Sequence, residues 1–354
     1  MRILYIASDT KALGGIQQYN RKFLDSLRAR GDEVVLVELK GGGFLAKARF
    51  IVKCFIQGVR HRPDLTVCAH VNYAPFGLFM KKWFGQDYIV CTHGIDVWEV
   101  RGALRRKALQ EADLITTVAE FTRDKIVRQL PEVRDRIYLL YNCVDGARFV
   151  PKVKSPALIK RYGLEGKKAI FTIARLLTIE GYKGYDRVIK AMPQILRAVP
   201  NAVYLLSGEG DDMPRVQKLV HEMGLEDKVI MTGYVPEEEM VDHYNLADVF
   251  IMPSKAEGAP AVFVEALACG IPVIAGNKDG SATPLMGGEL GLLIDPESVD
   301  EIVAAIINIL TGKVRKELLD RDFLRRKVLE KFGLDRFPQR VDEMFNRIEV
   351  EEKK

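Results

Sequence analysis

The stretch PSKAEGAPAVFVEALACGIPVIAG, from Pro253 to Gly276, carries the pattern that decides the fold. It begins as a loop that contains glycine and proline, and it continues from Ala261 to Ala268 as an apolar run of helix-forming residues. Gly270 and Pro272 end this predicted helix, and residues 272–275 then have the character of a short buried strand. The succession of loop, helix, turn and strand is typical of an α/β protein.

Two carboxylates flank the start of the predicted helix, Glu257 in the loop and Glu265 inside the helix. A helix N-terminus presents free backbone N–H groups and a partial positive charge, which suit a phosphate or a diphosphate. Carboxylates that faced such an anion would repel it, so they are better suited to accept hydrogen bonds from neutral hydroxyl groups of the same ligand. A sugar joined through a diphosphate to a nucleoside carries both kinds of group. The alternative is an ordinary surface loop and helix.

The segment from Glu257 to Gly276 resembles the signature of the retaining nucleotide-sugar glycosyltransferases of family four, which have GT-B architecture. The resemblance implies that Glu257 lies near the transferred sugar and that Glu265 binds the ribose. It also implies that the loop glycine, Gly258, contacts the donor. Nothing in the sequence suggests a metal-binding carboxylate cluster, so we expect neither a metal nor another cofactor.

The start of the predicted helix has one departure from an ideal phosphate site. Pro260 has no N–H group to donate. Contacts to the donor phosphates are therefore expected from its neighbours Ala261 and Val262.

Length and composition indicate two globular domains without a membrane span. The chain has 354 residues, of which 48% are hydrophobic and 29% are charged, and no apolar run reaches the roughly 18–20 residues of a transmembrane helix. Residues 1–9 have the pattern of a buried strand and lack the features of a signal peptide. The five cysteines are widely scattered and form no C-x2-C pair, so a reducing cytoplasm fits best.

The charge is unevenly distributed along the chain. Residues 1–150 hold 24 Lys and Arg against 16 Asp and Glu, whereas the remainder holds 29 against 32. A basic first half and a nearly neutral second half indicate a different partner for each half.

The first half opens with a strand over residues 2–8, a turn containing Gly14 and Gly15, a helix over residues 16–30 and a second strand. This order predicts a doubly wound α/β domain. The glycines do not form G-x-G-x-x-G, which argues against a dehydrogenase. The family resemblance implies that Gly14 and Gly15 meet the donor phosphates or the acceptor; a plain tight turn is the alternative.

A histidine follows a later strand of the first half. His93 comes directly after the predicted strand at residues 88–92, and ligands bind beyond the carboxyl ends of parallel strands. A single histidine is more often structural. The resembled family carries a histidine at this strand end, close to the sugar hydroxyls and the reacting centre.

Residues 44–62 mix large apolar side chains with five basic ones, and residues 79–84 repeat this mixture. Such a composition suits a membrane surface or a lipid-linked acceptor. The alternative is an ordinary helix with an apolar face in the core and a basic face in solvent.

In the second half, Arg175 follows a strand at residues 169–174, and Lys183 with Gly184 precedes a helix. This spacing resembles the family's Arg and Lys-Gly pair, which grips the donor diphosphate. Two fixed cations beside a strand end would neutralise the phosphates and the charge that develops as the nucleoside diphosphate leaves.

Two later turns complete the expected donor site. The resemblance implies that the nucleobase lies against the turn at Gly208 and Glu209 and against the turn at Tyr234 and Val235, largely through backbone groups. The family often has Gly-Gly-x-x-Glu in the loop after the quoted stretch, whereas this chain has Asp279-Gly280-Ser281 and no matching glutamate.

The sequence therefore predicts an α/β protein of two Rossmann-like, doubly wound parallel-sheet domains that face each other across a cleft. Residues 1–150, joined by the terminal helix at about 335–354, would bind the acceptor, and residues 151–334 would bind the nucleotide sugar.

The predicted activity is transfer of a hexose, with retention, from a UDP- or GDP-hexose to a saccharide or lipid-linked acceptor in polysaccharide biosynthesis. We expect it in the cytoplasm, with peripheral contact at the inner membrane face as the further hypothesis, and no nucleic acid partner. A nucleotide-sugar epimerase of the same architecture and a non-catalytic nucleotide-sugar-binding protein are the alternatives.

Overall fold

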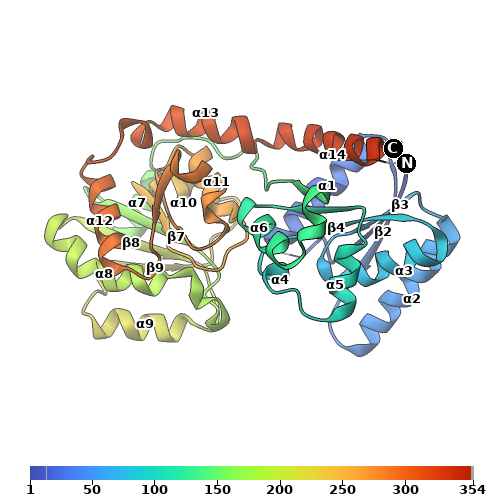
Figure 1. Ribbon diagram of the computed structural model, residues 1–354. Helices are drawn as coiled ribbons and strands as arrows, with labels where there is room; N and C mark the ends of the chain where they lie inside the picture. Colours follow the sequence, from blue (N-terminus) through green and yellow to red (C-terminus); the bar gives the residue numbers. More distant parts are fainter. Residues whose placement is uncertain (13, 352–354) are drawn as a thin grey trace. The chain divides into compact units, whose positions relative to one another are not determined.

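The computed structural model describes residues 1–12 and 14–351, which fold as two compact units (Figure 1). Unit 1 comprises Met1–Cys143 and Leu334–Lys354, and unit 2 comprises Val144–Gly333. Residues 352–354, which belong to the terminal helix expected from the sequence, lie outside the described residues. The sequence predicts the corresponding boundaries after residues 150 and 334.

Unit 1 contains a six-stranded parallel sheet in the order β2-β1-β3-β4-β5-β6. The strands are β1 (Arg2–Ser8), β2 (Glu33–Leu39), β3 (Leu65–Cys68), β4 (Asp87–Thr92), β5 (Leu114–Thr117) and β6 (Ile137–Leu139).

Helices cover both faces of this sheet because side chains alternate along each strand. From β1, Leu4 and Ile6 pack with Cys54 of α2, whereas the ring of Tyr5 meets Phe23 of α1 on the other face. The helices of unit 1 are α1 (Gly15–Ala29), α2 (Phe44–His61), α3 (Ala74–Phe84), α4 (Ile95–Trp98), α5 (Ala103–Gln110), α6 (Glu120–Gln129) and α14 (Phe337–Glu351), with 3-10 turns η1 (Val71–Tyr73), η2 (Pro131–Arg136) and η7 (Leu334–Arg336).

Unit 2 contains a second six-stranded parallel sheet, in the order β12-β11-β10-β7-β8-β9. The strands are β7 (Lys168–Ile173), β8 (Ala202–Ser207), β9 (Val229–Gly233), β10 (Val249–Met252), β11 (Val273–Gly276) and β12 (Gly291–Ile294). The two parallel sheets with their helices confirm the predicted fold class.

The core of unit 2 lies between its sheet and the helices that follow the strands. Val188 and Ile189 of α8 pack with Ile302 and Ile306 of α12 over β7, β8 and β10. The helices are α7 (Pro156–Tyr162), α8 (Tyr185–Ala198), α9 (Met213–Glu222), α10 (Met240–Leu246), α11 (Ala261–Ala268), α12 (Val299–Leu310) and α13 (Arg321–Phe332), with 3-10 turns η3 (Thr178–Lys183), η4 (Gly280–Ala282), η5 (Met286–Gly288) and η6 (Lys316–Leu319).

Each sheet has one point where the strand order reverses, between β1 and β3 in unit 1 and between β7 and β10 in unit 2. In open parallel sheets, ligands bind beyond the carboxyl ends of the strands at such a reversal. The loops after β1 and β3 and those after β7 and β10 are therefore where a site is expected in each unit.

Two elements differ from what the sequence predicts. The sequence predicts a short helix from Glu237 to Asn245, but α10 begins at Met240 because Pro236 to Glu239 form a turn closed by the Glu239 N–H to Pro236 carbonyl bond. The highly charged segment from Arg315 to the end is predicted to be helical, and its described part is divided into η6, α13, η7 and α14, with Gly333 between the two long helices.

Candidate functional site

The loop that follows β10 in unit 2 is fastened to the loop that follows β11 by one buried carboxylate. Asp279 accepts hydrogen bonds from the Ser254 hydroxyl at 2.7 Å and from the backbone N–H of Glu257 at 2.8 Å. The Gly280 N–H donates to the Glu257 carbonyl at 2.8 Å. Because Asp279 is almost fully buried, these bonds fix the backbone that carries Glu257.

The two loops approach each other so closely that one position admits only glycine. A Cβ atom on Gly280 would lie 1.6 Å from the carbonyl oxygen of Gly258. Any side chain at Gly280 would therefore push away the loop that contains the predicted donor residues Glu257 and Gly258.

Three of the four predicted catalytic residues meet in one charge network at the strand-order reversal of unit 2. The Lys183 ammonium lies 2.8 Å from the Glu180 carboxylate and 3.9 Å from the Glu257 carboxylate. Arg175 pairs with the other oxygen of Glu180. The Lys183 side chain is 10% exposed, whereas that of Arg175 is 67% exposed. Lys183 is thus a buried cation held between two acids, and Arg175 extends into solvent.

The electrostatics of this network favour a proton on Glu257 near neutral pH. Burial raises the pKa of Glu257 to about 7, and the nearby carboxylates of Asp279 and Glu180 act in the same direction. Lys183 opposes this shift. Glu257 can therefore offer either a carboxylate or a carboxylic acid to a bound hydroxyl group.

Helix α11 begins at Ala261 beside this network, as the sequence predicts. Its cap residue is Pro260, and no side chain caps the helix, so the N–H groups of Ala261 and Val262 are at an open helix start. Further along α11, Glu265 accepts a 2.7 Å hydrogen bond from the hydroxyl of Tyr244 on α10. Because Tyr244 is buried, it holds the Glu265 carboxylate in one orientation.

The two turns expected to hold the nucleobase are joined to the strand end that carries Arg175. The Gly208 N–H donates to the Gly233 carbonyl at 2.8 Å, and the Leu176 N–H donates to the Glu209 carbonyl at 2.9 Å. Tyr234 is exposed and its N–H lies 3.4 Å from the Glu209 carboxylate, whereas the side chain of Val235 is buried. Val235 can thus meet a ligand only through its backbone.

In unit 1, His93 lies at the carboxyl end of β4 in a defined tautomer. Its Nε2 atom is 2.9 Å from the carbonyl oxygen of Ala69, which can only accept a hydrogen bond. The proton therefore resides on Nε2, and in the neutral ring Nδ1 is the acceptor. Asp96 accepts hydrogen bonds from the backbone N–H groups of His93 and Gly94 at 3.0 and 2.7 Å, which fixes the turn.

A second histidine, His70, lies beside His93 and was missed by the sequence analysis. Its ring stacks on that of His93 with centroids 6.1 Å apart, and its Nε2 atom is 3.9 Å from the Asp96 carboxylate. Burial lowers the pKa of His70, so its ring is neutral at physiological pH. The sequence does carry a signal for this residue, because residues 65–69 are also predicted to form a strand, and His70 follows them just as His93 follows residues 88–92.

The glycine pair of unit 1 lies at the start of α1. Gly15 is the first helical residue, and Gly14 precedes it with a φ of 148°, which favours glycine. As a glycine, the cap residue Gly14 has no side chain that could bond the first N–H groups of α1.

Two further residues of the site were not predicted from the sequence. They are Glu180 and Asp279, which hold Lys183 and Glu257 in place.

Across residues 1–12 and 14–351, no three His, Cys, Asp or Glu side chains gather as a metal site. In the same part of the chain, no helix is both long and apolar enough to cross a bilayer.

Comparison with known families identifies both halves of the chain. Residues 155–322 match the family described as Glycosyl transferases group 1, and residues 13–148 match Glycosyltransferase Family 4.

Among characterised proteins, the chain is similar to GDP-mannose-dependent alpha-(1-6)-phosphatidylinositol monomannoside mannosyltransferases. It is 32% identical to that of Mycolicibacterium smegmatis in an alignment 338 residues long that covers 85% of this chain and 87% of the relative. It is 34% identical to that of Mycobacterium tuberculosis strain H37Rv in an alignment 240 residues long that covers 64% of this chain and 61% of the relative.

Solved structures share the fold at lower sequence identity. Sucrose-phosphate synthase from Thermosynechococcus elongatus has a TM-score of 0.82 at 20% identity and covers 99% of both chains. Anabaena HepE in complex with UDP has a TM-score of 0.79 at 18% identity and covers 98% of this chain and 100% of its own.

Proposed function

The chain belongs to the group 1 glycosyltransferases of family four, and from this premise we propose that unit 2 binds a nucleotide diphosphate hexose for transfer to an acceptor held by unit 1. The protein is a hexosyltransferase of GT-B fold. The proposal concerns which residues perform the reaction, what the donor and acceptor are, and the stereochemical course, which we infer to be retaining.

The observation that carries the proposal is the charge network of Arg175, Glu180, Lys183 and Glu257. It lies at the strand-order reversal of unit 2, beside the open start of α11. Taking these charges out of water is unfavourable, and charged groups that are held together at such a cost are typical of sites that serve a ligand. A diphosphate would give Lys183 and Arg175 the anionic partner that suits both.

Each group in unit 2 has a proposed task. Arg175 and Lys183 neutralise the diphosphate and the charge that grows on it as the glycosidic bond breaks, without a metal ion. The N–H groups of Ala261 and Val262 donate to a phosphate oxygen. Glu257 accepts hydrogen bonds from hydroxyls of the transferred hexose.

The remaining donor contacts go to the nucleoside. Glu265, oriented by Tyr244, accepts hydrogen bonds from the ribose. The turns at Gly208 and Glu209 and at Tyr234 and Val235 meet the base. Retention follows if the acceptor attacks from the face that the phosphate leaves, with the departing phosphate taking the acceptor proton.

In unit 1, we assign His93 to the sugar hydroxyls near the reacting centre. Its Nδ1 atom is an acceptor because Nε2 donates to the Ala69 carbonyl. The loop at Gly14 and Gly15 and the start of α1 meet the donor phosphates or the acceptor.

The donor that we propose is a GDP-hexose, and GDP-mannose is the first candidate. The proposed acceptor is a lipid-linked saccharide. Support comes from the mycobacterial relatives, which are GDP-mannose-dependent mannosyltransferases of phosphatidylinositol monomannoside. The proposed location is the cytoplasm, with contact at the inner membrane face.

A thermal-shift screen of nucleotide diphosphate sugars, followed by a transfer assay with a phosphatidylinositol mannoside acceptor, tests this. A ligand at 100-fold its dissociation constant should add about 2.7 kcal/mol to the stability. Stabilisation by GDP-mannose and a glycosylated lipid product are expected. An isomerised sugar in the absence of acceptor would favour the epimerase, and binding without turnover would favour a non-catalytic binding protein.

A further inference from the structure

The outer surface of α2 in unit 1 is apolar where an ordinary covering helix is polar. Only Cys54 and Gly58 of α2 are buried, and Phe50 is partly buried against the core. These residues are spaced by four, so they form one face of the helix, since each residue turns the helix by about 100°. The sequence alternative of an apolar face in the core therefore accounts for few of the apolar side chains.

The remaining apolar residues of α2 lie away from the core. Phe44 and Leu45 are 83% and 70% exposed, and five more are also exposed. At about 100° per residue, Val52, Ile56 and Val59 lie opposite the buried face. The exposed apolar side chains of α2 are Phe44, Leu45, Ile51, Val52, Phe55, Ile56 and Val59.

Aromatic side chains extend this apolar surface from α2 onto the end of α3. The rings of Phe55 and Phe79 are 5.6 Å apart, and Phe79 stacks on Trp83 at 5.7 Å. Trp83 is 74% exposed, and the neighbouring Phe84 is also exposed. We call the exposed apolar residues of α2 together with Phe79, Trp83 and Phe84 the α2–α3 surface.

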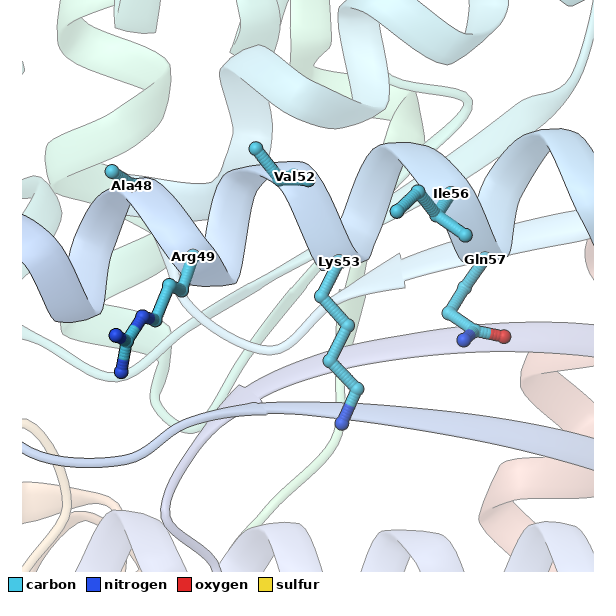
Figure 2. A pocket seen from close by; sticks show the side chains of 6 residues that line it. All are labelled: Ala48, Arg49, Val52, Lys53, Ile56 and Gln57. Carbon is cyan, nitrogen blue, oxygen red and sulfur yellow. The ribbon is translucent and has the colours of Figure 1, made fainter.

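Basic side chains border the α2–α3 surface along one flank of α2. Arg49, Lys53 and Arg60 follow at spacings of four and seven, which places them in one row. Figure 2 shows Arg49 and Lys53 projecting from one side of α2, with Ala48 and Val52 on the other. A hollow of about 450 Å³ over this face is lined by α2 alone, through Ala48, Arg49, Val52, Lys53, Ile56 and Gln57.

No acid balances these cations. Residues 41–63 contain five Lys and Arg and no Asp or Glu. Among the side chains that the structure describes, those of residues 1–12 and 14–348, no carboxylate lies within ion-pair distance of Arg49, Lys53 or Arg60. In contrast, Lys81 and Lys82 of α3 pair with Asp113 and Glu111. The α2 row is thus the part of this surface that is free to meet an external anion.

We propose that the α2–α3 surface docks on an anionic lipid bilayer, with its aromatic and aliphatic side chains in the interface and the α2 row on the headgroups. An apolar centre with a basic border is the pattern of an interfacial helix. A second copy of the chain would set two such basic rows against each other, and like charges in contact repel. Nucleic acid would meet an apolar surface that offers few hydrogen-bond donors.

The docking surface is connected to the candidate acceptor site within unit 1. The ring of Phe50 on α2 lies 5.4 Å from Tyr73, Tyr73 lies 6.2 Å from His70, and His70 stacks on His93. Helix α2 also begins at the carboxyl edge of the sheet, because it follows β2. A lipid-linked acceptor in a docked membrane would therefore meet the edge that carries His93; this last step rests on the proposed function.

Vesicle sedimentation tests the docking without donor or acceptor. We expect binding to vesicles that contain phosphatidylglycerol, weaker binding to pure phosphatidylcholine, and release at high salt. Val52→Asp/Ile56→Asp should weaken binding at least tenfold, and Arg49→Glu/Lys53→Glu should weaken it by about fivefold per cation on anionic vesicles only. Matched changes in unit 2, Val153→Asp and Lys313→Glu/Lys316→Glu, should leave binding unchanged, since Val153 is 89% exposed and both lysines are exposed.

Trp83 provides a second readout of the depth of insertion. Brominated lipids should quench the fluorescence of the unmodified protein, and Trp83→Phe should abolish most of that quenching. Because all substituted side chains are exposed, thermal unfolding should be unchanged and would reveal a misfolded variant.

Three results would overturn the docking. They are no binding to either vesicle, binding that both α2 pairs leave unchanged, or a dimer in sedimentation velocity that Val52→Asp/Ile56→Asp dissociates. Failure of docking would leave transfer to a soluble acceptor intact, whereas failure of the proposed donor site would leave vesicle binding intact, so the two are distinguishable.

Discussion

The two sheets have the same plan but offer different chemistry at their carboxyl edges. Each has six parallel strands with one reversal of order. At the reversal of unit 2 lie Lys183, Glu180, Glu257 and the buried Asp279. At the corresponding edge of unit 1 lie the rings of His70, His93 and Tyr19. The shared topology fixes where each site lies, and the side chains decide which ligand it can take.

The difference suggests a division of labour between the two edges. At the edge of unit 2, several charged side chains lie close together, and an anionic diphosphate can take the place of a carboxylate as the partner of their cations. The edge of unit 1 offers the Nδ1 atom of His93 as a hydrogen-bond acceptor, and burial lowers the pKa of the adjacent His70, so the His70 ring supplies no fixed charge for a phosphate. Neutral sugar hydroxyls suit such an edge better.

The largest expected effect comes from removing the buried cation of unit 2. Lys183→Ala removes the cation that lies between Glu180 and Glu257 and leaves Glu180 only its pair with the largely exposed Arg175, and breaking a buried pair costs about 3–5 kcal/mol of stability. Binding of GDP or UDP should weaken by about 1–3 kcal/mol, as for a lost charged hydrogen bond. Urea unfolding and calorimetric titration measure the two quantities.

Arg175→Ala is the companion change that keeps the buried pair. Because Arg175 is largely exposed, we expect little loss of stability but a similar loss of about 1–3 kcal/mol in nucleoside diphosphate binding. Lys190→Ala on α8, which removes an exposed pair with Asp186, is the control and should leave binding unchanged. If both Arg175→Ala and Lys183→Ala bind the nucleoside diphosphate with unchanged affinity, the diphosphate does not bind at this edge of unit 2.

The fold was predictable from sequence because local patterns and tertiary structure agree. The apolar run over residues 261–268 is α11, and the glycine and proline after it separate α11 from β11. Strands buried on both faces, such as β1 and β7, appear as short apolar runs between polar turns. The strand order within each sheet was not predicted, since no single run specifies its neighbour, and the GT-B architecture came from the family resemblance.

The candidate site was only partly predictable, because partners distant in sequence complete it. Glu180 lies in a turn with no local feature that separates it from a solvated glutamate, and its role depends on Arg175 and Lys183. Asp279 was noted as a departure from the family pattern, but its bonds to Ser254 and Glu257 span more than twenty residues. The exposed apolar side of α2 could not be distinguished from a core face by periodicity alone.

The next prediction distinguishes the roles of Glu257 and Glu265 in unit 2. Glu265→Gln should raise the dissociation constant of the nucleoside diphosphate, because the ribose is present in donor and product alike. Glu257→Gln should leave that constant near the unmodified value and lower turnover by about tenfold, because it meets the transferred hexose. Binding and initial rate are measured on both variants under one condition.

Tyr244→Phe is a further test of the different roles of Glu257 and Glu265. It removes the hydroxyl that orients Glu265, so it should reproduce part of the Glu265→Gln defect in binding and none of the Glu257→Gln defect. The reverse pattern in the two glutamate variants would mean that the donor runs in the opposite direction along α11. Full activity in both would remove α11 from the site.

A smaller loss of activity is expected from a substitution at the carboxyl edge of the sheet in unit 1. His93→Ala removes the Nδ1 acceptor and should slow transfer by about tenfold, the equivalent of about 1–1.5 kcal/mol, without changing nucleoside diphosphate affinity. His70→Ala should have a weaker effect through the position of the His93 ring. His221→Ala, an exposed change in unit 2, is the control. A loss of nucleoside diphosphate binding in His93→Ala would contradict the division between the two edges.

The last expected effect concerns the proton on Glu257 and appears as a dependence of stability on pH. Crowding and burial at the edge of unit 2 raise its pKa from 4.5 to about 7, so between these values the native state binds more protons at this group than the unfolded chain does. The stabilising contribution of the protonated group is therefore complete below pH 4.5 and is lost as the pH rises to about 7. Glu257→Gln cannot titrate, so its stability relative to the unmodified protein should improve across this window by at most about 1.4 kcal/mol per pH unit. Urea unfolding of both proteins at several pH values measures this difference in stability. If this difference in stability does not change between pH 4.5 and about 7, the Glu257 carboxyl has the same pKa in the native and the unfolded protein. The burial and the neighbouring carboxylates at this edge would then not raise its pKa.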